Sequence, residues 1–220
     1  MKYLITGITG FAGPHLARLL LDNGHEVEGI VRTANGREQD LLDILSPEEI
    51  EQIAIHCLDL KHYFSVQKLL TEQSYDGIFH LAAQSHPPTS FRDPILTFEE
   101  NVNATVNLTT ALEGMDTKIM VCSTSEVYGN RAGGQSTVQE DAALSPSNPY
   151  GASKAAIDLY MQERMANEKV TGFVTRAFSH TGPRRGRIFS ISSDAYQIAK
   201  MMCGSDSRTL RVGNLNTERV

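Results

Sequence analysis

Short runs of apolar residues alternate along the chain with longer segments in which apolar residues recur every three or four positions. The runs are typical of buried parallel strands, and the longer segments are typical of helices that pack on a sheet. The runs predict strands at 3–5, 26–31, 53–57, 77–81, 118–122 and 170–176. The segments between them predict helices at 14–21, 40–45, 65–72, 94–113 and 150–168. This repeated order predicts a doubly wound α/β fold, in which helices cover both faces of a parallel sheet.

The end of the chain follows a different pattern. Residues 177–189 contain Gly, Pro and Arg and predict an irregular loop, which is followed by a helix at 191–203 and a short strand at 210–212. We therefore expect a domain at 1–176 and the beginning of a small C-terminal substrate lobe at 177–220. Because the chain stops at Val220 without a closing element, we expect this lobe to be truncated.

A glycine-rich turn joins the first predicted strand to the first helix. Residues 6–13 read Thr-Gly-Ile-Thr-Gly-Phe-Ala-Gly, with glycines at a GxxGxxG spacing. At such a junction glycines allow a tight turn, close approach of the backbone to a pyrophosphate and close packing of helix on strand. The first backbone N–H groups of the helix then face the anion. A glycine triplet can also be only a turn, but its place at this junction favours a Rossmann-type dinucleotide site.

Tyr150 and Lys154 stand four residues apart at the start of the last long helix of the first domain. Residues at this spacing share one helical face. A free tyrosine has a pKa of about 10 and is a poor base at neutral pH. A neighbouring ammonium group favours the phenolate and lowers that pKa. The spacing also arises by chance in amphipathic helices, so its weight comes from the glycine-rich turn upstream.

Composition narrows the class of protein. The 220 residues suffice for one full α/β domain, and 40% hydrophobic and 21% charged residues are ordinary for a globular protein. A net charge of -6 argues against nucleic-acid binding, which needs a basic stripe. No apolar run approaches membrane-spanning length, and no signal peptide precedes the first strand, so we expect a cytoplasmic protein.

Cysteine and histidine spacing predicts no metal site. The three cysteines form an odd count without metal-ligand spacing, which suits reduced thiols, and the seven histidines are scattered. Cys57 and Cys122 lie in apolar runs, so we expect both to pack in the core.

These motifs resemble the extended short-chain dehydrogenase/reductase family, and within it the GDP-mannose 4,6-dehydratases and the GDP-4-keto-6-deoxymannose reductases. The matching stretches include 6–13, 80–86, 123–129, 149–154 and 183–186. The resemblance implies an NADP-dependent enzyme acting on a GDP-sugar. It also implies a homodimer or homotetramer in which the helices near 94–113 and 149–168 pair with their copies.

The resemblance implies a set of cofactor contacts: Gly7, Thr9, Gly10, Phe11, Gly13, Arg32, Asp59, Leu60, Leu81, Ala82, Ala83, Tyr150 and Lys154. Charge at the end of the second strand bears on the type of cofactor. An acid there binds the ribose 2′-OH of NAD, whereas an arginine accommodates the 2′-phosphate of NADP. Arg32 therefore predicts NADP, with an exposed arginine in a polar loop as the alternative. Asp59 is expected to contact adenine or to cap a helix.

The resemblance also implies catalytic roles for Thr124, Glu126, Tyr150 and Lys154. Tyr150 would take the C4 hydroxyl proton of the hexose while a hydride passes to NADP, and Lys154 would hold the phenolate and the ribose. Thr124 would bond the same C4 oxygen. Glu126 would remove the C5 proton before water leaves from C6, and its alternative is a structural pair near the loop.

Substrate contacts are expected from a further group of residues: Gln84, Ser85, Ser179, Arg184 and Arg185. The two arginines suit the diphosphate of a GDP-sugar, because guanidinium groups bind phosphate oxygens in pairs. Ser179 departs from the asparagine usual in the family, and Thr181-Gly182-Pro183 is closer to the reductase version. The alternative to a dehydratase function is therefore the reductase, or another nucleotide-sugar epimerase or dehydratase. A non-catalytic NADP sensor is disfavoured by the intact Tyr, Lys and Thr set.

Overall fold

The computed structural model describes residues 1–33, 38–134, 137–204 and 209–214. The chain divides into two compact units, Met1–Ala177 and Phe178–Val220. This division falls one residue after the predicted boundary between residues 176 and 177.

The first unit is built on a six-stranded parallel sheet with the strand order β3-β2-β1-β4-β5-β6. The strands are β1 (Lys2–Thr6), β2 (Glu26–Val31), β3 (Ala54–Cys57), β4 (Gly77–His80), β5 (Lys118–Thr124) and β6 (Thr171–Ala177). This is the strand order of the Rossmann fold, so the predicted fold class is confirmed.

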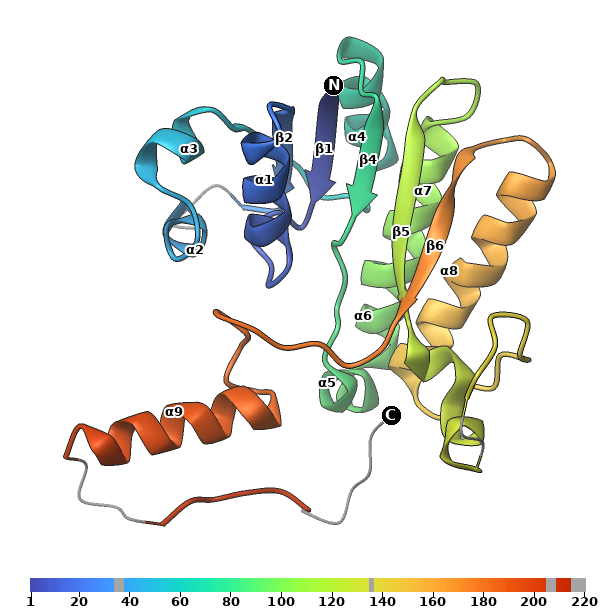
Figure 1. Cartoon of the computed structure of the whole chain (residues 1–220). Helices are drawn as coiled ribbons and strands as arrows, with labels where there is room; N and C mark the ends of the chain where they lie inside the picture. Colours follow the sequence, from blue (N-terminus) through green and yellow to red (C-terminus); the bar gives the residue numbers. More distant parts are fainter. Residues whose placement is uncertain (34–37, 135–136, 205–208, 215–220) are drawn as a thin grey trace. The chain divides into compact units, whose positions relative to one another are not determined.

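Helical segments connect these strands. In chain order they are α1 (Gly13–Asp22), α2 (Glu38–Leu42), α3 (Pro47–Glu51), α4 (Tyr63–Glu72), α5 (Pro87–Arg92), α6 (Pro94–Phe98), the π-helical turn η1 (Glu99–Asn103), α7 (Ala104–Ala111), the 3-10 segment η2 (Ser125–Gly134) and α8 (Pro149–Ala166). Figure 1 shows how they flank the sheet.

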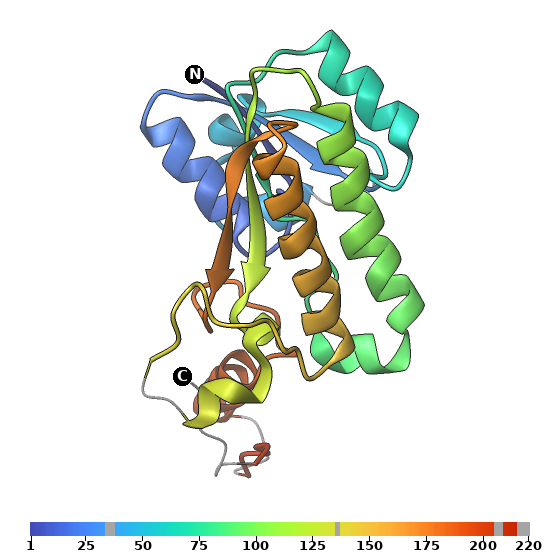
Figure 2. The ribbon, with the colours of Figure 1, turned by 90° about the vertical axis from the view of Figure 1, so that its right-hand side faces the viewer.

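Two hydrophobic clusters cover the two faces of the sheet. Leu4 and Ile5 are neighbours on β1 and both fully buried, because successive side chains of a strand point to opposite faces. Leu4 packs in the cluster with residues of α4, α7 and α8, whereas Ile5 packs with residues of α1 and α2. Figure 2 shows α1 on one side of the sheet and α4, α7 and α8 on the other. Burial on both faces explains the nearly continuous apolar runs of the strands.

The helical connections differ from the predicted ones. Helix α5, which begins at Pro87, is not among the predicted helices; a proline in the first turn of a helix loses no hydrogen bond. The single helix predicted at 94–113 is divided into α6, η1 and α7. Asp93 starts α6 by accepting a hydrogen bond from the Leu96 N–H at 2.9 Å. The sequence does not predict α3, although Ser46 and Glu49 form a capping box at its start.

The segment between β5 and α8 contains helical structure, although no helix is predicted there. It begins with η2, which is kinked at Gly129, where φ is 62°. The Ser145 N–H donates to the Val127 backbone oxygen at 2.8 Å, so the segment folds back on itself. Val127 and Tyr128 pack against Ala155 of α8 in a small cluster of their own.

The second unit contains α9 (Ser190–Met202), which agrees with the helix predicted at 191–203. The strand predicted at 210–212 is wrong, since residues 209–214 carry no strand. A strand requires a hydrogen-bonded neighbour. The backbone N–H and C=O of Arg211 bond instead to the Gln197 side chain, each at 2.9 Å.

The two cysteines of the first unit differ in exposure. Cys57 is exposed because β3 is the edge strand of the sheet, so its predicted core packing is wrong. Cys122 is partly buried.

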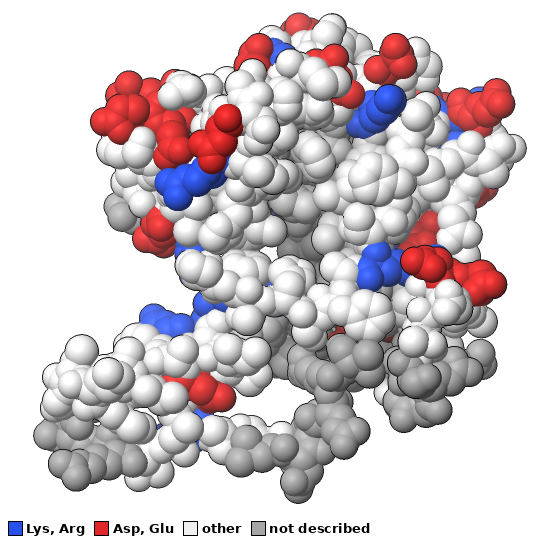
Figure 3. Space-filling model, in the orientation of Figure 1, with Lys and Arg blue, Asp and Glu red and all other residues white. Residues whose placement is uncertain are grey.

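Within the described ranges no helix is long and apolar enough to cross a membrane. In the same ranges no group of three His, Cys, Asp or Glu side chains is placed to hold a metal ion. On the face of the first unit in Figure 3, basic atoms form separate spots among acidic and uncharged ones.

Candidate active site

The glycine-rich turn lies at the carboxyl end of β1, beside the carboxyl end of β4. The helices that follow these two neighbouring strands cover opposite faces of the sheet, so this is the switch point where ligands bind in such folds. Gly7 has a φ of 70°, and a Cβ on it would lie 2.8 Å from the Ala82 nitrogen. A Cβ on Gly13 would overlap the Ile8 backbone oxygen. The fold therefore requires glycine at both positions.

The turn has the form of a phosphate cradle. The Gly10 N–H donates to the Gly7 oxygen at 2.8 Å, which closes the turn. Ala12 holds the N-cap position of α1, and because it has no side-chain oxygen the helix starts without side-chain capping. Of the predicted contacts in this turn, Thr9 is buried, whereas Phe11 is partly exposed. Such a turn before a helix N-terminus fits a pyrophosphate.

A buried histidine ties the ends of β1 and β4 together. His80 Nδ1 lies 2.8 Å from the Thr6 hydroxyl, and Nε2 lies 3.0 Å from the Thr105 hydroxyl. Thr105 donates to the Asn101 oxygen and Thr6 accepts from the Ala82 N–H, so one tautomer, protonated on Nε2, satisfies the whole chain of bonds. Burial, with a smaller contribution from the charge of Lys154, lowers the pKa of His80 to about 3. The network fixes the backbone at Ala82.

Other predicted residues follow β4. Leu81 and Ala83 are partly buried, and the Leu81 N–H donates to the Thr6 oxygen at 3.2 Å. Ser85 is exposed. The Gln84 amide is used within the protein, since Nε2 donates to the Thr97 hydroxyl at 2.9 Å and Oε1 accepts from the His86 N–H at 2.6 Å. Its predicted contact with substrate stays a prediction.

The residues predicted to bind the adenosine end of the cofactor lie after β2 and β3. Arg32 pairs with Glu100, with 2.8 Å between Nη1 and Oε1, and its side chain is 55% exposed. Asp59 accepts a hydrogen bond from the Lys61 N–H at 2.9 Å. The N-cap of α4 is His62, so the alternative of Asp59 as a helix cap is wrong. Leu60 is buried, and its oxygen accepts from Asn107.

Tyr150 and Lys154 lie at the start of α8, with exposed fractions of 9% and 4%. The Lys154 ammonium donates to the Cys122 backbone oxygen of β5 at 2.8 Å. Burial lowers the pKa of Lys154 to about 8. The Tyr150 N–H donates to the Ser90 hydroxyl at 3.1 Å, which ties the start of α8 to α5. A lysine held in this way remains a cation at neutral pH, one helical turn from the phenol.

Thr124 and Glu126 complete the predicted catalytic set at the end of β5. Thr124 is 9% exposed, and its hydroxyl accepts from the Glu126 N–H at 3.3 Å. The Glu126 carboxylate accepts from Asn148 Nδ2 at 2.9 Å. A Cβ on Gly151 would lie 2.9 Å from the Glu126 backbone oxygen, so the turn containing Glu126 lies against the first turn of α8. All four predicted catalytic residues therefore belong to the junction of β5, η2 and α8.

The remaining predicted residues belong to the second unit. Ser179 is exposed. Arg184 has a φ of 72°, a left-handed conformation that is uncommon for a residue with a side chain. The Arg185 guanidinium stacks on the Phe189 ring, with 3.6 Å between Cζ and the ring centroid. Their contact with a diphosphate stays a prediction.

Three residues that support the site are not among those predicted from the sequence. Asn101, in η1, binds both backbone groups of Gln84 and donates to Ser153 of α8 at 2.8 Å. Ser90 holds the Tyr150 N–H, and nothing in the pattern points to it. Asn148 could have been found, because an asparagine directly before a proline at the start of a helix is a recognised N-cap signal.

The family of the chain follows from a comparison with known proteins. The model of the GDP-mannose 4,6 dehydratase family matches residues 4–220. The chain belongs to this family. A GDP-mannose 4,6-dehydratase of Sordaria araneosa is 34% identical over 98% of the chain, and a GDP-6-deoxy-D-mannose reductase of Pseudomonas aeruginosa is 29% identical over 99%. The chain spans 39% and 65% of the length of these two relatives.

Solved structures similar to this member of the GDP-mannose 4,6 dehydratase family share its fold. A UDP-glucose 4-epimerase of Thermus thermophilus, in complex with NAD, is 27% identical and matches with a TM-score of 0.79. The match covers 93% of this chain and 63% of the epimerase chain. DesIV, a dTDP-glucose 4,6-dehydratase of Streptomyces venezuelae with NAD bound, is 25% identical and matches with a TM-score of 0.78. The match covers 93% of this chain and 63% of the DesIV chain. These structural relatives act on nucleotide sugars.

Proposed function

We propose that the protein is an NADP-dependent nucleotide-sugar 4,6-dehydratase that converts GDP-mannose to GDP-4-keto-6-deoxymannose in the cytoplasm. The observation that carries the proposal is the junction of β5, η2 and α8, where Thr124, Glu126, Tyr150 and Lys154 meet. Membership of the GDP-mannose 4,6 dehydratase family supports the choice of substrate.

The residues have separate tasks in the proposed mechanism. Tyr150 removes the proton of the C4 hydroxyl, and the Lys154 cation stabilises the phenolate. The Thr124 hydroxyl bonds the C4 oxygen. A bound nicotinamide would supply the hydride acceptor for oxidation at C4 and the hydride donor for reduction at C6. Glu126 takes the proton from C5 of the 4-keto sugar and gives it to the C6 hydroxyl, which leaves as water.

The residues present fit a nicotinamide dinucleotide. Gly7 and Gly13 allow the close backbone packing of the turn, where a Cβ would clash with the backbone of Ala82 or Ile8, and the helix start after them is suited to a pyrophosphate. The choice of NADP over NAD rests on Arg32, since the two solved relatives carry NAD. The diphosphate of the substrate is assigned to Arg184 and Arg185, with Gln84, Ser85 and Ser179 as further contacts.

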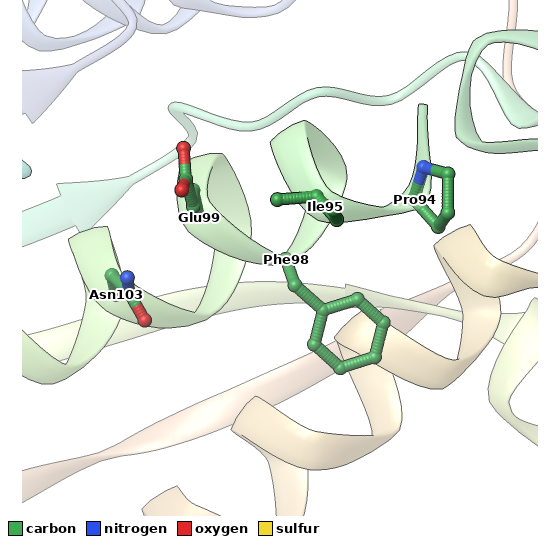
Figure 4. Close-up of a pocket in the computed structure, with 5 residues that line it drawn as sticks. All are labelled: Pro94, Ile95, Phe98, Glu99 and Asn103. Carbon is green, nitrogen blue, oxygen red and sulfur yellow. The ribbon is translucent and has the colours of Figure 1, made fainter. Parts of the chain in front are cut away.

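A homodimer, with a homotetramer as the larger alternative, forms part of the proposal. Ile95 and Phe98 of α6 are 73% and 39% exposed, and Leu159 of α8 is 56% exposed. Pro94, Ile95, Phe98, Glu99 and Asn103 line an open groove of about 350 Å³. Figure 4 shows the Phe98 ring extending from α6 toward α8. An exposed apolar surface of this kind suits a second copy of the chain.

Incubation of the protein with GDP-mannose and a catalytic amount of NADP tests the proposed reaction. We expect a product that has lost one water, with no net change in the cofactor. UDP-glucose and dTDP-glucose serve as control substrates. Conversion of the 4-keto-6-deoxy sugar with consumption of NADPH, and no conversion of GDP-mannose, would support the reductase instead. NADP binding without turnover of either sugar would support the sensor.

The Glu126→Gln variant separates oxidation from water loss. It should bind NADP as the natural protein does and should still reduce it in a single turnover, but water should not leave. The Tyr150→Phe variant is the matched control, because it should stop the reaction before any reduced cofactor forms. Full dehydratase activity of Glu126→Gln would remove this residue from the mechanism.

A further inference from the structure

The Asn148 side chain lies between the helix that begins with the catalytic tyrosine and the carboxylate of Glu126. Asn148 is the N-cap of α8, with extended backbone angles of φ -147° and ψ 162°. Its Oδ1 accepts a hydrogen bond from the Gly151 N–H at 2.7 Å. Its Nδ2 donates to Glu126 Oε2 at 2.9 Å. One amide group thus connects the first turn of α8 to the proposed base.

The two ends of this amide have different chemistry. The oxygen satisfies a backbone N–H that would otherwise lack a partner, which aspartate or serine at the N-cap does as well. The nitrogen donates to a carboxylate, and a hydrogen bond to the charged form of an acid favours that form. Aspartate cannot replace this second function, because it has no donor and carries a negative charge when ionised.

We infer that Asn148 is a positioning residue for the elimination step, which fixes the Glu126 carboxylate against the first turn of α8. The inference rests on the proposed role of Glu126. In that step the C5–H bond breaks, its proton forms an O–H bond on Glu126, and the electron pair left on C5 is delocalised into the C4 ketone. The C6–O bond then breaks as Glu126 gives the proton to the C6 hydroxyl, which departs as water. Only the ionised carboxylate can accept the proton.

Among the described residues, several ionisable groups near this turn are already engaged in other contacts. Lys154 of α8 donates to the Cys122 oxygen, and Arg176 of β6 binds Asp158. Tyr128, on η2 itself, bonds to Arg176, and Tyr150 stands in the first turn of α8. On the segment before α8, Glu140 and Asp141 are exposed. The Asn148 amide, which contacts the Glu126 carboxylate directly, is therefore the group to change in order to test this contact.

The test compares Asn148→Asp with Asn148→Ser. Both retain an N-cap acceptor, so a role limited to capping predicts similar behaviour. We expect Asn148→Asp to shift the acid limb of the dehydration pH profile to higher pH by about 1 unit or more, because two carboxylates in contact cannot both ionise freely. Asn148→Ser should leave the limb in place and lower the dehydration rate by about tenfold, while NADP affinity stays unchanged.

Stability gives a readout that does not depend on turnover. In Asn148→Asp the folded pKa of the carboxylate pair is raised, so the stability of this variant, relative to Asn148→Ser, should fall as pH rises through that pKa. Adding Glu126→Gln should abolish this fall, because the second charge is gone. The inference is overturned by either of two results. One is that stability falls with pH in the Asn148→Asp, Glu126→Gln double variant as it does in Asn148→Asp alone. The other is that Asn148→Asp still dehydrates the sugar and its pH profile has the same acid limb as that of the natural protein.

Failure of the proposed function would look different. If the natural protein does not dehydrate GDP-mannose, but the fall in stability with pH is present and is abolished by Glu126→Gln, then Asn148 does control the charge of Glu126 and the assigned reaction is wrong.

Discussion

Arg176 binds the Asp158 carboxylate through two hydrogen bonds, from Nε at 2.7 Å and from Nη2 at 2.9 Å. The carboxylate is 1% exposed and lies one helical turn beyond Lys154 on α8. Burial raises the pKa of Asp158, but the hydrogen bonds and charge of Arg176, together with the hydrogen bond from Gln162 and a smaller contribution from Ser123, hold the pKa below its usual value. The remaining nitrogen, Nη1, donates to the Tyr128 hydroxyl and to the Glu140 oxygen, at 2.8 and 2.6 Å. Arg176 thus joins β6, α8 and the segment around Glu126.

We expect Arg176→Met to lower the free energy of unfolding by about 3–5 kcal/mol, because it leaves Asp158 charged, buried and without its cation. The measurement is urea unfolding at neutral pH. Arg176→Met combined with Asp158→Leu should recover part of the loss, since no buried charge remains. Lys68→Met is a surface control, because Lys68 and Glu72 form an exposed pair. A loss in Arg176→Met as small as in Lys68→Met would contradict this account.

Gly7→Ala should weaken NADP binding and destabilise the protein, whereas Gly24→Ala should have only the second effect. Both glycines have left-handed backbones, with φ of 70° and 72°. A Cβ on Gly7 meets the Ala82 nitrogen at 2.8 Å, while a Cβ on Gly24 meets nothing within 4 Å. The left-handed backbone conformation should cost each alanine variant about 1–2 kcal/mol of stability. Cofactor titration and thermal unfolding of both variants give the comparison, and equal NADP affinities would refute the role of Gly7 in the cradle.

The sequence predicted the strands more accurately than the helical connections. A strand buried on both faces carries apolar residues on both sides, as Val27, Ile30 and Val31 of β2 do, and the limits predicted for β2 match those observed. The helix predicted at 94–113 is interrupted at η1, where Asn101 makes polar contacts with Gln84 and Ser153 that hydrophobic spacing does not report. The strand predicted at 210–212 needed a neighbouring strand, and apolar residues alone do not supply one.

The candidate site also contains features that the sequence predicts and others that it does not. Glycines and the Tyr150–Lys154 spacing can be read from the sequence, because they are backbone or helical requirements. Residues that act through long-range hydrogen bonds cannot be found in this way. Ser90 contacts Tyr150 across 60 positions of sequence, and Asn101 contacts Ser153 across 52. Only the folded chain brings such pairs together.

Glu100→Gln should raise the affinity for NADP relative to NAD. Arg32 pairs with the Glu100 carboxylate at 2.8 Å, so a 2′-phosphate has to compete with Glu100 for the guanidinium. Removal of the charge should strengthen NADP binding by about tenfold and leave NAD binding nearly unchanged. Arg32→Ala is the matched control and should lose the preference for the phosphate. Calorimetric titration measures the affinities of both variants for NADP and for NAD. An NADP-to-NAD affinity ratio that is unchanged in both variants would exclude Arg32 as the phosphate contact.

Ile95→Asp should convert the proposed dimer to a monomer. The Ile95 side chain is 73% exposed on α6, and a charge there would be buried without a partner on association. Phe64 on α4 is 82% exposed and lies outside the proposed interface, so Phe64→Asp should leave the oligomeric state unchanged. Sedimentation equilibrium measures both. A dimer that survives Ile95→Asp, or is lost in Phe64→Asp, would place the interface elsewhere.

Lys154→Met should stabilise the cofactor-free protein while abolishing the reaction. Burial lowers the pKa of Lys154 from 10.5 to about 8, which means that the folded state disfavours the charged ammonium. Below pH 8 the lysine is charged in both the folded and the unfolded state, so the folded protein carries the full desolvation cost, and the variant should gain about 1–3 kcal/mol. As pH rises from about 8 to 10.5 the unfolded lysine still binds a proton that the folded one has released, so the natural protein regains stability and the difference should shrink. Urea unfolding of both proteins at pH 7 and above pH 10 provides the measurement. A variant that is less stable than the natural protein at pH 7 would show that the hydrogen bond to Cys122 outweighs the burial of charge.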